Sequence, residues 1–183
     1  ENNSVKCWGY NDAGQLGLED GNSRGDDAGE MGDFLATVNL GTGRTAKALA
    51  LGDWHSCAIL DTDEVKCWGY NFYGQLGLGD TLGRGDDAGQ MGDSLVTVSL
   101  GAGRTAKEIG AGMGHTCAIL DNNTVKCWGR NNAGQLGLGD VNQRGDDAGE
   151  MGDSLTALDL DGGPVKGISL GEGHTCAVLN NNS

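Results

Sequence analysis

The sequence is poor in basic residues, and it has no long hydrophobic run. Its 183 residues include 12 Lys and Arg against 26 Asp and Glu, which gives a formal net charge of −14. Surfaces that bind nucleic acids need clustered basic side chains, so this composition argues against a nucleic-acid partner. No stretch approaches the roughly 20 consecutive apolar residues of a membrane-spanning helix. We therefore expect neither nucleic-acid binding nor membrane insertion.

Proline is almost absent, whereas glycine is abundant. The chain has one proline and 35 glycines, and the glycines show no Gly-x-y triplet period. Glycine used in this way supplies many tight turns and close backbone contacts. This composition is typical of an all-β repeat protein.

The chain is organised around a short motif that recurs. CAILDTDEVKCWG occupies residues 57–69 and returns as CAILDNNTVKCWG at 117–129. The second half of the motif opens the chain at 5–9, and the first half closes it at 176–179. The sequence is therefore a tandem array. We interpret it as one repeat domain over residues 1–183, with units at about 5–64, 65–124 and 125–183.

Each unit has the pattern of about four short antiparallel strands. In the first unit the expected strands are 35–40, 46–52, 58–60 and 65–68, because these β-compatible runs are bounded by Gly, Asp, Asn and Thr. Four strands per unit is the content of one blade of a β-propeller. The sequence thus predicts an all-β fold with three propeller-type blades.

The cysteines lie in pairs that a hairpin would bring together. If Asp61–Asp63 form a three-residue loop whose last residue is left-handed, Cys57 faces Cys67. Directly opposed residues have Cβ atoms about 4.5–5.5 Å apart, close to the distance in a disulfide. The predicted disulfides are Cys57–Cys67 and Cys117–Cys127.

Other states of the cysteines remain open at this point. All six could stay reduced and pack as small hydrophobic residues. A two-residue turn would shift the register by one and place the paired cysteines on different faces. Metal binding is disfavoured because the pairs lack a short C-x-x-C spacing. If the disulfides form, the compartment is oxidising, and we expect an extracellular or cell-surface protein.

Two further patterns concern modification and metal binding. Three Asn-x-Ser/Thr sequons fall at the hairpin turn and are acceptor sites for glycosylation, at Asn2, Asn122 and Asn181. The loop RGDDAGEMGD, at residues 24–33, recurs in each unit, and its carboxylates could gather oxygen ligands around calcium. Against calcium, the spacing is not that of an EF-hand and Arg24 can pair with Asp27. The calcium candidates are Asp26, Asp27, Glu30, Asp33, Asp86, Asp87, Asp93, Asp146, Asp147, Glu150 and Asp153.

The histidines and tryptophans follow the repeat, which favours structural roles. His55, His115 and His174 occupy one position of the unit, beside Ser or Thr and then Cys. We find no nucleophile with a base and an orienting acid outside the repeat pattern, so we expect no enzyme and no catalytic residues. Trp8, Trp68 and Trp128 are expected to anchor blade packing through their rings, with the indole N–H bonded locally. Three aromatics break the repeat and mark where a partner surface is best sought, namely Trp54, Phe72 and Tyr73.

The repeat itself resembles a known family. The pattern G-x-x-H-T-C-A-x-L, followed by V-K-C-W-G-x-N-x-x-G-Q-L-G-L-G-D, is similar to the regulator of chromosome condensation repeat and covers essentially the whole chain. The resemblance implies blades of a β-propeller that usually closes with seven. In that family the fold serves guanine-nucleotide exchange on the small GTPase Ran, enzyme inhibition and interaction roles. The cysteine-bearing variety looks like the secreted, microbial or algal branch, and nothing here matches the basic segments with which the nuclear exchange factor contacts nucleosomes.

Three blades cannot close a ring of seven, so the two ends need cover. Cys7 and Cys176 each belong to the half-hairpin that the other lacks. Three arrangements fit: a slice of a longer propeller, a subunit that assembles head to tail through a Cys176–Cys7 bridge, or one of several chains that close a ring together. We expect a non-enzymatic extracellular structural or protein-interaction module, such as a segment of a filament or scaffold. The alternative is a protein-binding regulator that resembles an exchange factor or an enzyme inhibitor.

Overall fold

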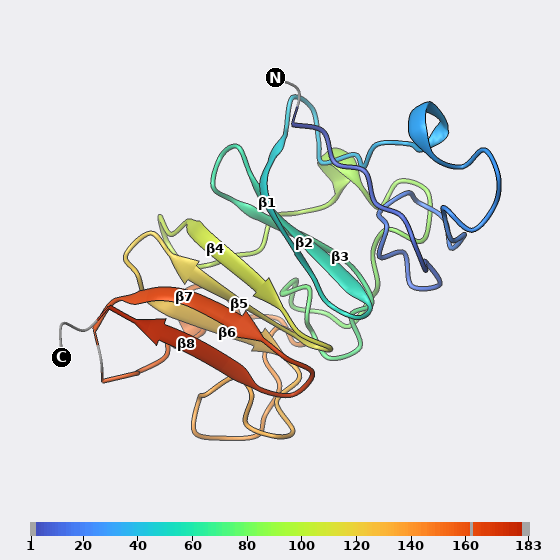
Figure 1. The fold of residues 1–183 in the computed structure, drawn as a ribbon. Coiled ribbons are helices and arrows are strands. Elements are labelled where there is room, and N and C mark those ends of the chain that lie inside the picture. Colours follow the sequence, from blue (N-terminus) through green and yellow to red (C-terminus); the bar gives the residue numbers. More distant parts are fainter. Residues whose placement is uncertain (1–2, 162, 181–183) are drawn as a thin grey trace.

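The structure, a computed structural model, describes residues 3–161 and 163–180 and is built of antiparallel β-sheets (Figure 1). The strands are β1 (Ala46–Leu51), β2 (His55–Leu60), β3 (Val65–Gly69), β4 (Ala106–Ala111), β5 (His115–Leu120), β6 (Val125–Gly129), β7 (Val165–Leu170) and β8 (Thr175–Leu179). They form sheets in the orders β1-β2-β3, β4-β5-β6 and β7-β8. Single turns of 3-10 helix lie at η1 (Gly32–Phe34), η2 (Gly92–Ser94) and η3 (Gly152–Ser154). The all-β prediction is confirmed, and no helix in the described ranges has the length and apolar character needed to cross a bilayer.

The β2–β3 and β5–β6 hairpins have the register predicted from the sequence. Cys57 lies opposite Cys67, and a hydrogen bond from Leu60 N to Glu64 O (2.8 Å) closes a loop of three residues. The last of these, Asp63, adopts a left-handed φ of 65°. The short polar side chain of Asp or Asn tolerates that conformation better than a branched one would. The two hairpins are crosslinked by the disulfides Cys57–Cys67 and Cys117–Cys127, each with a Cα–Cα distance of 4.1 Å.

The sheets pack face to face, in a row that follows the sequence (Figure 1). Strand β4 contacts β1 and β2 of the sheet before it, and β7 contacts β4 and β5. Between the first two sheets, Ile59 and Val65 pack against Ile109 and Leu120 in one buried cluster. Strands β2 and β5 are buried along their whole length because both faces of their sheets are covered. Each seam between blades is therefore a small hydrophobic core.

The fourth strand expected in each unit is an extended segment instead. Residues 35–40 make a single backbone hydrogen bond to the neighbouring hairpin segment, from Val38 N to Val5 O (2.9 Å). The next backbone acceptor along it, Asn39 O, bonds Gly92 N of the following unit (3.0 Å). The segment thus divides its backbone between two blades, and no ladder forms. Its apolar side chains are nevertheless buried, which explains why the sequence pattern looked like a strand.

Candidate functional site

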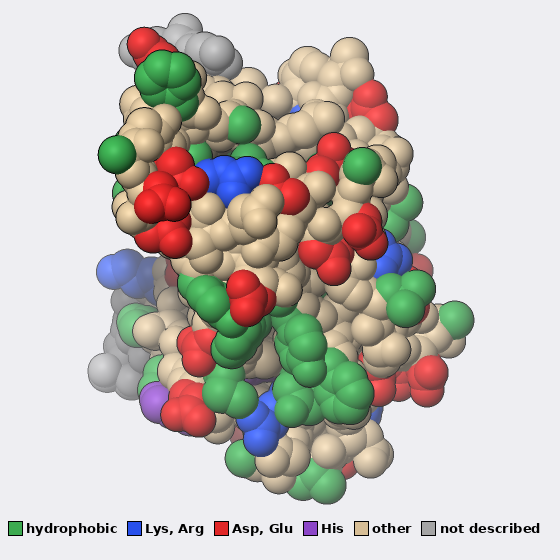
Figure 2. Space-filling model, turned by 90° about the vertical axis from the view of Figure 1, so that its right-hand side faces the viewer, with side chains coloured by type: hydrophobic (Ala, Val, Ile, Leu, Met, Phe, Trp, Pro, Cys, Tyr) green, Lys and Arg blue, Asp and Glu red, His purple; other side chains and the backbone are tan. Residues whose placement is uncertain are grey.

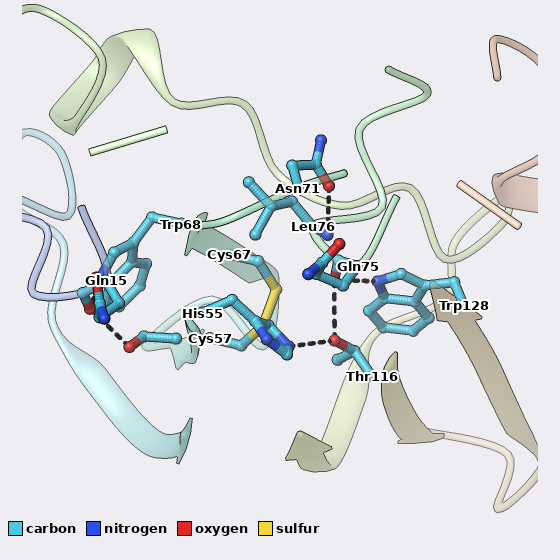
Figure 3. The surroundings of a disulfide bond; sticks show 11 residues. Gln15, His55, Cys57, Cys67, Trp68, Asn71, Gln75, Leu76, Thr116 and Trp128 are labelled. Carbon is cyan, nitrogen blue, oxygen red and sulfur yellow. Dashed lines mark hydrogen bonds between the residues drawn. A yellow bond between two sulfur atoms is a disulfide. The ribbon is translucent and has the colours of Figure 1, made fainter. Parts of the chain in front are cut away.

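The seam between neighbouring blades is held by a polar network as well as by apolar packing. His55 Nε2 lies 2.9 Å from Thr116 Oγ1 in the next blade. The Thr116 hydroxyl donates to Gln75 O (2.9 Å), and the Trp128 indole N–H donates to the same carbonyl (3.0 Å) (Figure 3). The hydroxyl has one proton and gives it to Gln75, so it accepts the bond from His55. His55 therefore carries a proton on Nε2.

Burial accounts for the charge state of these histidines. Both imidazoles are fully buried in their seams. Loss of solvation lowers the pKa of His55 to about 3, with a smaller contribution from the charge of His115. The pKa of His115 is lowered to about 4 by burial and then by His174. These histidines therefore join blades as neutral hydrogen-bonding groups.

The same network recurs along the chain. His115 Nε2 lies 2.9 Å from Thr175 Oγ1, and the Thr175 hydroxyl donates to Gln135 O (2.8 Å). At the start of the array, the Ser56 hydroxyl and the Trp68 indole N–H both bond one carbonyl, that of Gln15, at 2.8 and 3.0 Å. The seam is thus a repeated interface. The bond from the Ser or Thr hydroxyl to the Gln carbonyl recurs in all three blades, and the His–Thr bond occurs twice.

The two ends of the array each expose half of such a seam. Trp8 is 62% exposed, whereas its equivalents Trp68 and Trp128 are fully buried. At the other end, Val178 is 60% exposed, whereas its equivalent Ile59 is 2% exposed. We call the surface around Trp8, Leu49, Leu51 and Ser56 the N-end face. The C-end face consists of His174, Cys176 and Val178 on and beside β8.

The N-terminal segment already sits where the last strand of a preceding blade would lie. Val5 O accepts a hydrogen bond from Val38 N (2.9 Å), as Val65 O does from Val98 N (2.8 Å). The β7–β8 sheet at the other end has two strands where the other sheets have three. Cys7 and Cys176, which lie in these two regions, are not disulfide-bonded in the structure. The segment 5–9 therefore corresponds to the third strand of a blade, and the β7–β8 sheet is a blade without that strand.

The repeated acidic loops do not gather their carboxylates around a common point. In the described part of the chain, no group of three or more His, Cys, Asp or Glu side chains is placed to hold a metal ion. Glu30 accepts hydrogen bonds from Gly25 N (2.7 Å) and Asp27 N (3.2 Å), which closes the loop on itself. Gln90 does the same in the second unit. An amide oxygen can replace the carboxylate because the role is that of a hydrogen-bond acceptor.

At least one other carboxylate of these loops accepts hydrogen bonds from a neighbouring unit. Asp93 accepts hydrogen bonds from the backbone N (2.8 Å) and the hydroxyl (2.6 Å) of Thr42 in the preceding unit. Arg24 pairs with Asp20 at 2.6 Å, not with Asp27 as expected. The described residues therefore do not bring three or more of the predicted calcium ligands together. Glu30, Glu150, Asp93 and Asp153 instead accept hydrogen bonds from backbone N–H groups.

The remaining predicted residues are placed as follows. Asn122 is exposed at the tip of its hairpin, where its side-chain oxygen accepts a hydrogen bond from the Thr124 hydroxyl (2.8 Å). The other two sequons begin at Asn2 and Asn181, which lie outside the described residues. Trp54 and Tyr73 line one pocket with Tyr70 and four other residues that the sequence did not single out. The repeat pattern could have indicated one of them, because Met113 stands where the first unit has Asp53.

The stacked sheets and their repeated seams define a protein of propeller-type repeats. Residues 46–75 and 106–135 match the family model of the regulator of chromosome condensation (RCC1) repeat. The chain is 36% identical over 144 residues to the ultraviolet-B receptor UVR8 of Arabidopsis thaliana, covering 76% of this chain and 28% of the receptor. It is 40% identical over 96 residues to the human probable E3 ubiquitin-protein ligase HERC4, covering 52% of this chain and 8% of the ligase. The chain therefore belongs to the RCC1 repeat family.

Solved structures support the same fold. Prp20p from Saccharomyces cerevisiae superposes with a TM-score of 0.69 at 17% identity, covering 98% of this chain and 40% of Prp20p. Human WBSCR16 superposes with a TM-score of 0.66 at 14% identity, covering 100% of this chain and 41% of that protein. The chain thus spans about two-fifths of each of these proteins and less than a third of UVR8. Protein interaction is the role that this repeat architecture supports.

Proposed function

We propose that this chain is a non-enzymatic extracellular scaffold module that joins further copies head to tail through its two end faces. The observation that carries the proposal is the exposure of two half-seams whose equivalents inside the array are buried against each other. Each copy would receive the β7–β8 sheet of its neighbour on the N-end face. Repetition of this heterologous contact gives a ring if the rotation closes and a filament if it does not.

The internal seams specify the contacts of the proposed joint. By analogy with the pair Cys57 and Cys67, Cys176 of one copy faces Cys7 of the next. His174 of the first copy then reaches Ser56 of the second, as His55 reaches Thr116. The indole N–H of Trp8 in the second copy is directed to the carbonyl of Gln135 in the first, as that of Trp128 is to Gln75. The joint would therefore bury His174 and Trp8, the two exposed side chains among these contacts.

The extracellular location rests on the cysteines. Two disulfides inside buried hairpins are typical of a protein from an oxidising compartment. Burial raises the pKa of the Cys7 thiol to about 11, so this thiol is protonated and slow to react at neutral pH. We therefore expect the Cys7–Cys176 bond to form only after docking has placed the two sulfurs together and an oxidant is present.

The oligomeric state of the 183-residue chain tests this proposal. Light scattering after size exclusion, and intact mass with and without reductant, should show oligomers and a peptide that links Cys7 to Cys176. Val178→Asp should reduce the chain to a monomer because the substituted carboxylate would be buried in the joint. The matched control is Leu82→Asp, which alters a residue that is equally exposed but lies in a loop of the central unit.

The opposite result has a clear meaning. A chain that stays monomeric at high concentration under oxidising conditions, with free thiols at both positions, would refute head-to-tail assembly of copies. The end faces would then be left for further blades of a longer chain.

A protein-binding regulator is the second candidate. Prp20p, a yeast protein of this fold, has binding properties toward Gsp1p and histones, and it has been solved bound to Kap60. A stable 1:1 complex between monomeric chain and one partner protein, without self-association, would favour this candidate over the scaffold.

A further inference from the structure

A second surface, unrelated to the end faces, lies where the first two blades meet at one end of their strands. It is a pocket of about 420 Å³ lined by Asp12, Trp54, Tyr70, Tyr73, Gln75 and Met113. Trp54 and Tyr70 are each 40% exposed, although aromatic side chains elsewhere in the seams are buried. On the molecular face shown in Figure 2, hydrophobic side chains gather into a patch flanked by acidic groups. Aromatic side chains that remain open to solvent in a concave site are available to a partner.

The pocket is built from positions at which the repeats differ. Trp54 stands where the second unit has Gly114, and Tyr73 stands where the first unit has Ala13. Met113 likewise replaces the acidic Asp53. These side chains are not needed to pack a blade, because other units form their blades without them. Three residues that differ from their equivalents in the repeat therefore line the same pocket. This is the arrangement expected of a binding site whose residues are not required by the fold.

Its electrostatics favour a cation. The Tyr10 hydroxyl donates to Asp12 (2.5 Å), and the Tyr10 ring packs edge-on against Trp54 with centroids 5.3 Å apart. The carboxylate is therefore held beside the indole. Arg130 already lies over the Tyr73 ring, 5.2 Å from its centroid, so this cluster accommodates a guanidinium within the molecule. The negative faces of the rings and the carboxylate attract the same charge.

An unused donor adds a second requirement. The Gln75 side chain is fully buried, and its Oε1 accepts a hydrogen bond from Tyr73 N (3.0 Å). Its Nε2 has no hydrogen-bond partner among the described residues. Buried donors in folded proteins nearly always have a hydrogen-bond partner. The Nε2–H group of Gln75 has none within the described residues, so it is available to an acceptor on a bound molecule. A peptide carbonyl provides one.

We propose that this pocket binds an arginine side chain carried by an extended segment of a basic partner protein. The guanidinium lies against Trp54 and Tyr70 and pairs with Asp12, while a carbonyl of the segment reaches Gln75. Arginine suits the site better than lysine because its planar, weakly hydrated group stacks on aromatic rings and bonds a carboxylate with two N–H groups. The formal net charge of −14 favours a basic partner over an acidic one. This site is independent of the end faces and does not require the scaffold function.

A pair of short peptides that differ by one charge tests the proposal. Acetyl-Gly-Arg-Gly-amide and its citrulline counterpart have nearly the same shape, and only the first carries a cation. Titration into the ¹⁵N-labelled monomeric Val178→Asp chain should shift the indole N–H signal of Trp54, with the arginine peptide bound at least about fivefold more tightly. The signals of the buried Trp68 and Trp128 should not move.

Variants that copy the other repeats provide the controls. Trp54→Gly and Tyr73→Ala install residues that the equivalent positions already tolerate, and each should weaken the arginine peptide by about three- to thirtyfold without unfolding the chain. Asp12→Asn should erase the preference for arginine over citrulline, whereas Asp27→Asn, the same change in an acidic loop, should not. Equal binding of the two peptides, or binding that survives Trp54→Gly and Asp12→Asn, would overturn the assignment. So would absence of binding to a properly folded chain, whatever its oligomeric state.

Discussion

His55 Nε2 lies 2.9 Å from the hydroxyl of Thr116, so one hydrogen bond ties the first blade to the second. The imidazole is neutral in this bond at neutral pH, because burial lowers the pKa of His55 to about 3. The same group titrates near 6.5 when unfolded, so the unfolded chain takes up the proton first as the pH falls. The contribution of neutral His55 to the free energy of unfolding is therefore complete above about pH 6.5. It decreases below that pH, by about 2 kcal/mol at pH 5.

Urea unfolding at several pH values checks this expectation. His55→Gln removes the titrating group, so between about pH 7.5 and pH 5 it should lose about 2 kcal/mol less stability than the parent chain. Carboxylates that titrate in the same range are present in both proteins and cancel in the comparison. Parallel stability curves for the two proteins would show that His55 is protonated in the folded state.

Thr116 is expected to be the most sensitive polar residue of this seam. Thr116→Val keeps the shape but removes the hydroxyl, which leaves His55 and one lone pair of Gln75 O without that partner. We expect a loss of about 2–3 kcal/mol in the free energy of unfolding. Thr116→Ser should cost less than about 1 kcal/mol, because Ser56 performs the same bond in the first blade. Denaturant melts of both variants measure the difference, and equal losses would contradict the role of the hydroxyl.

Trp68 and Trp8 provide a matched pair for the indole bond. Trp68→Phe removes the N–H that bonds Gln15 O at 3.0 Å inside the seam, and should cost about 1–3 kcal/mol. Trp8→Phe changes an exposed side chain and should leave the stability of the monomeric Val178→Asp chain within about 0.5 kcal/mol. Thermal unfolding measures both effects. A destabilised Trp8→Phe monomer would mean that Trp8 packs against its own chain.

The disulfide of each hairpin should stabilise the fold by lowering the conformational entropy of the unfolded chain. Closing a loop of ten residues contributes about 2.5–3 kcal/mol on the chain-entropy estimate. Cys57→Ala combined with Cys67→Ala should therefore lower the free energy of unfolding by at least this amount, since packing atoms are also lost. The same double change at positions 117 and 127 should give a similar value. A loss below about 1 kcal/mol in both hairpins would show that the reduced chain is already constrained.

The two free thiols should differ in reactivity. Burial raises the pKa of Cys7 from 9.0 to about 11, so at a fixed pH its thiolate fraction is about 100-fold lower than that of an unperturbed cysteine. Cys176 is exposed. A thiol-reactive probe should therefore modify Cys176 first in the monomeric Val178→Asp chain, with Cys7 at least about tenfold slower, because its thiolate is scarcer and less accessible. Mass analysis of peptides over time assigns the two rates, and comparable rates would contradict the burial of Cys7.

The hairpins could be predicted because their determinants are local. A three-residue loop with a left-handed Asp63 fixes the register, and the register alone decides that Cys57 meets Cys67. The fourth strand could not be predicted in the same way. Residues 35–40 have the composition of a strand, but their backbone groups bond two different blades, and that division depends on how the blades are stacked.

The candidate sites, too, could be predicted from the sequence only in part. The sequence placed His55 and Trp68 at repeated positions and Trp54 and Tyr73 outside the repeat, but it did not indicate that Gln75 would be buried with an unused donor. The acidic loops looked like ligand sets because their carboxylates are close in sequence. In the described residues no three of them are placed to hold one ion, and Glu30 and Asp93 bond backbone N–H groups instead.

The sequence by itself determined the all-β repeat, the hairpin register and the pairing of four cysteines, because these follow from turns and periodicities within a few residues. Only the tertiary structure decided which surfaces are open. Trp8 and Trp68 have the same local sequence, yet one is exposed and the other buried, because burial depends on whether a neighbouring blade is stacked against the residue.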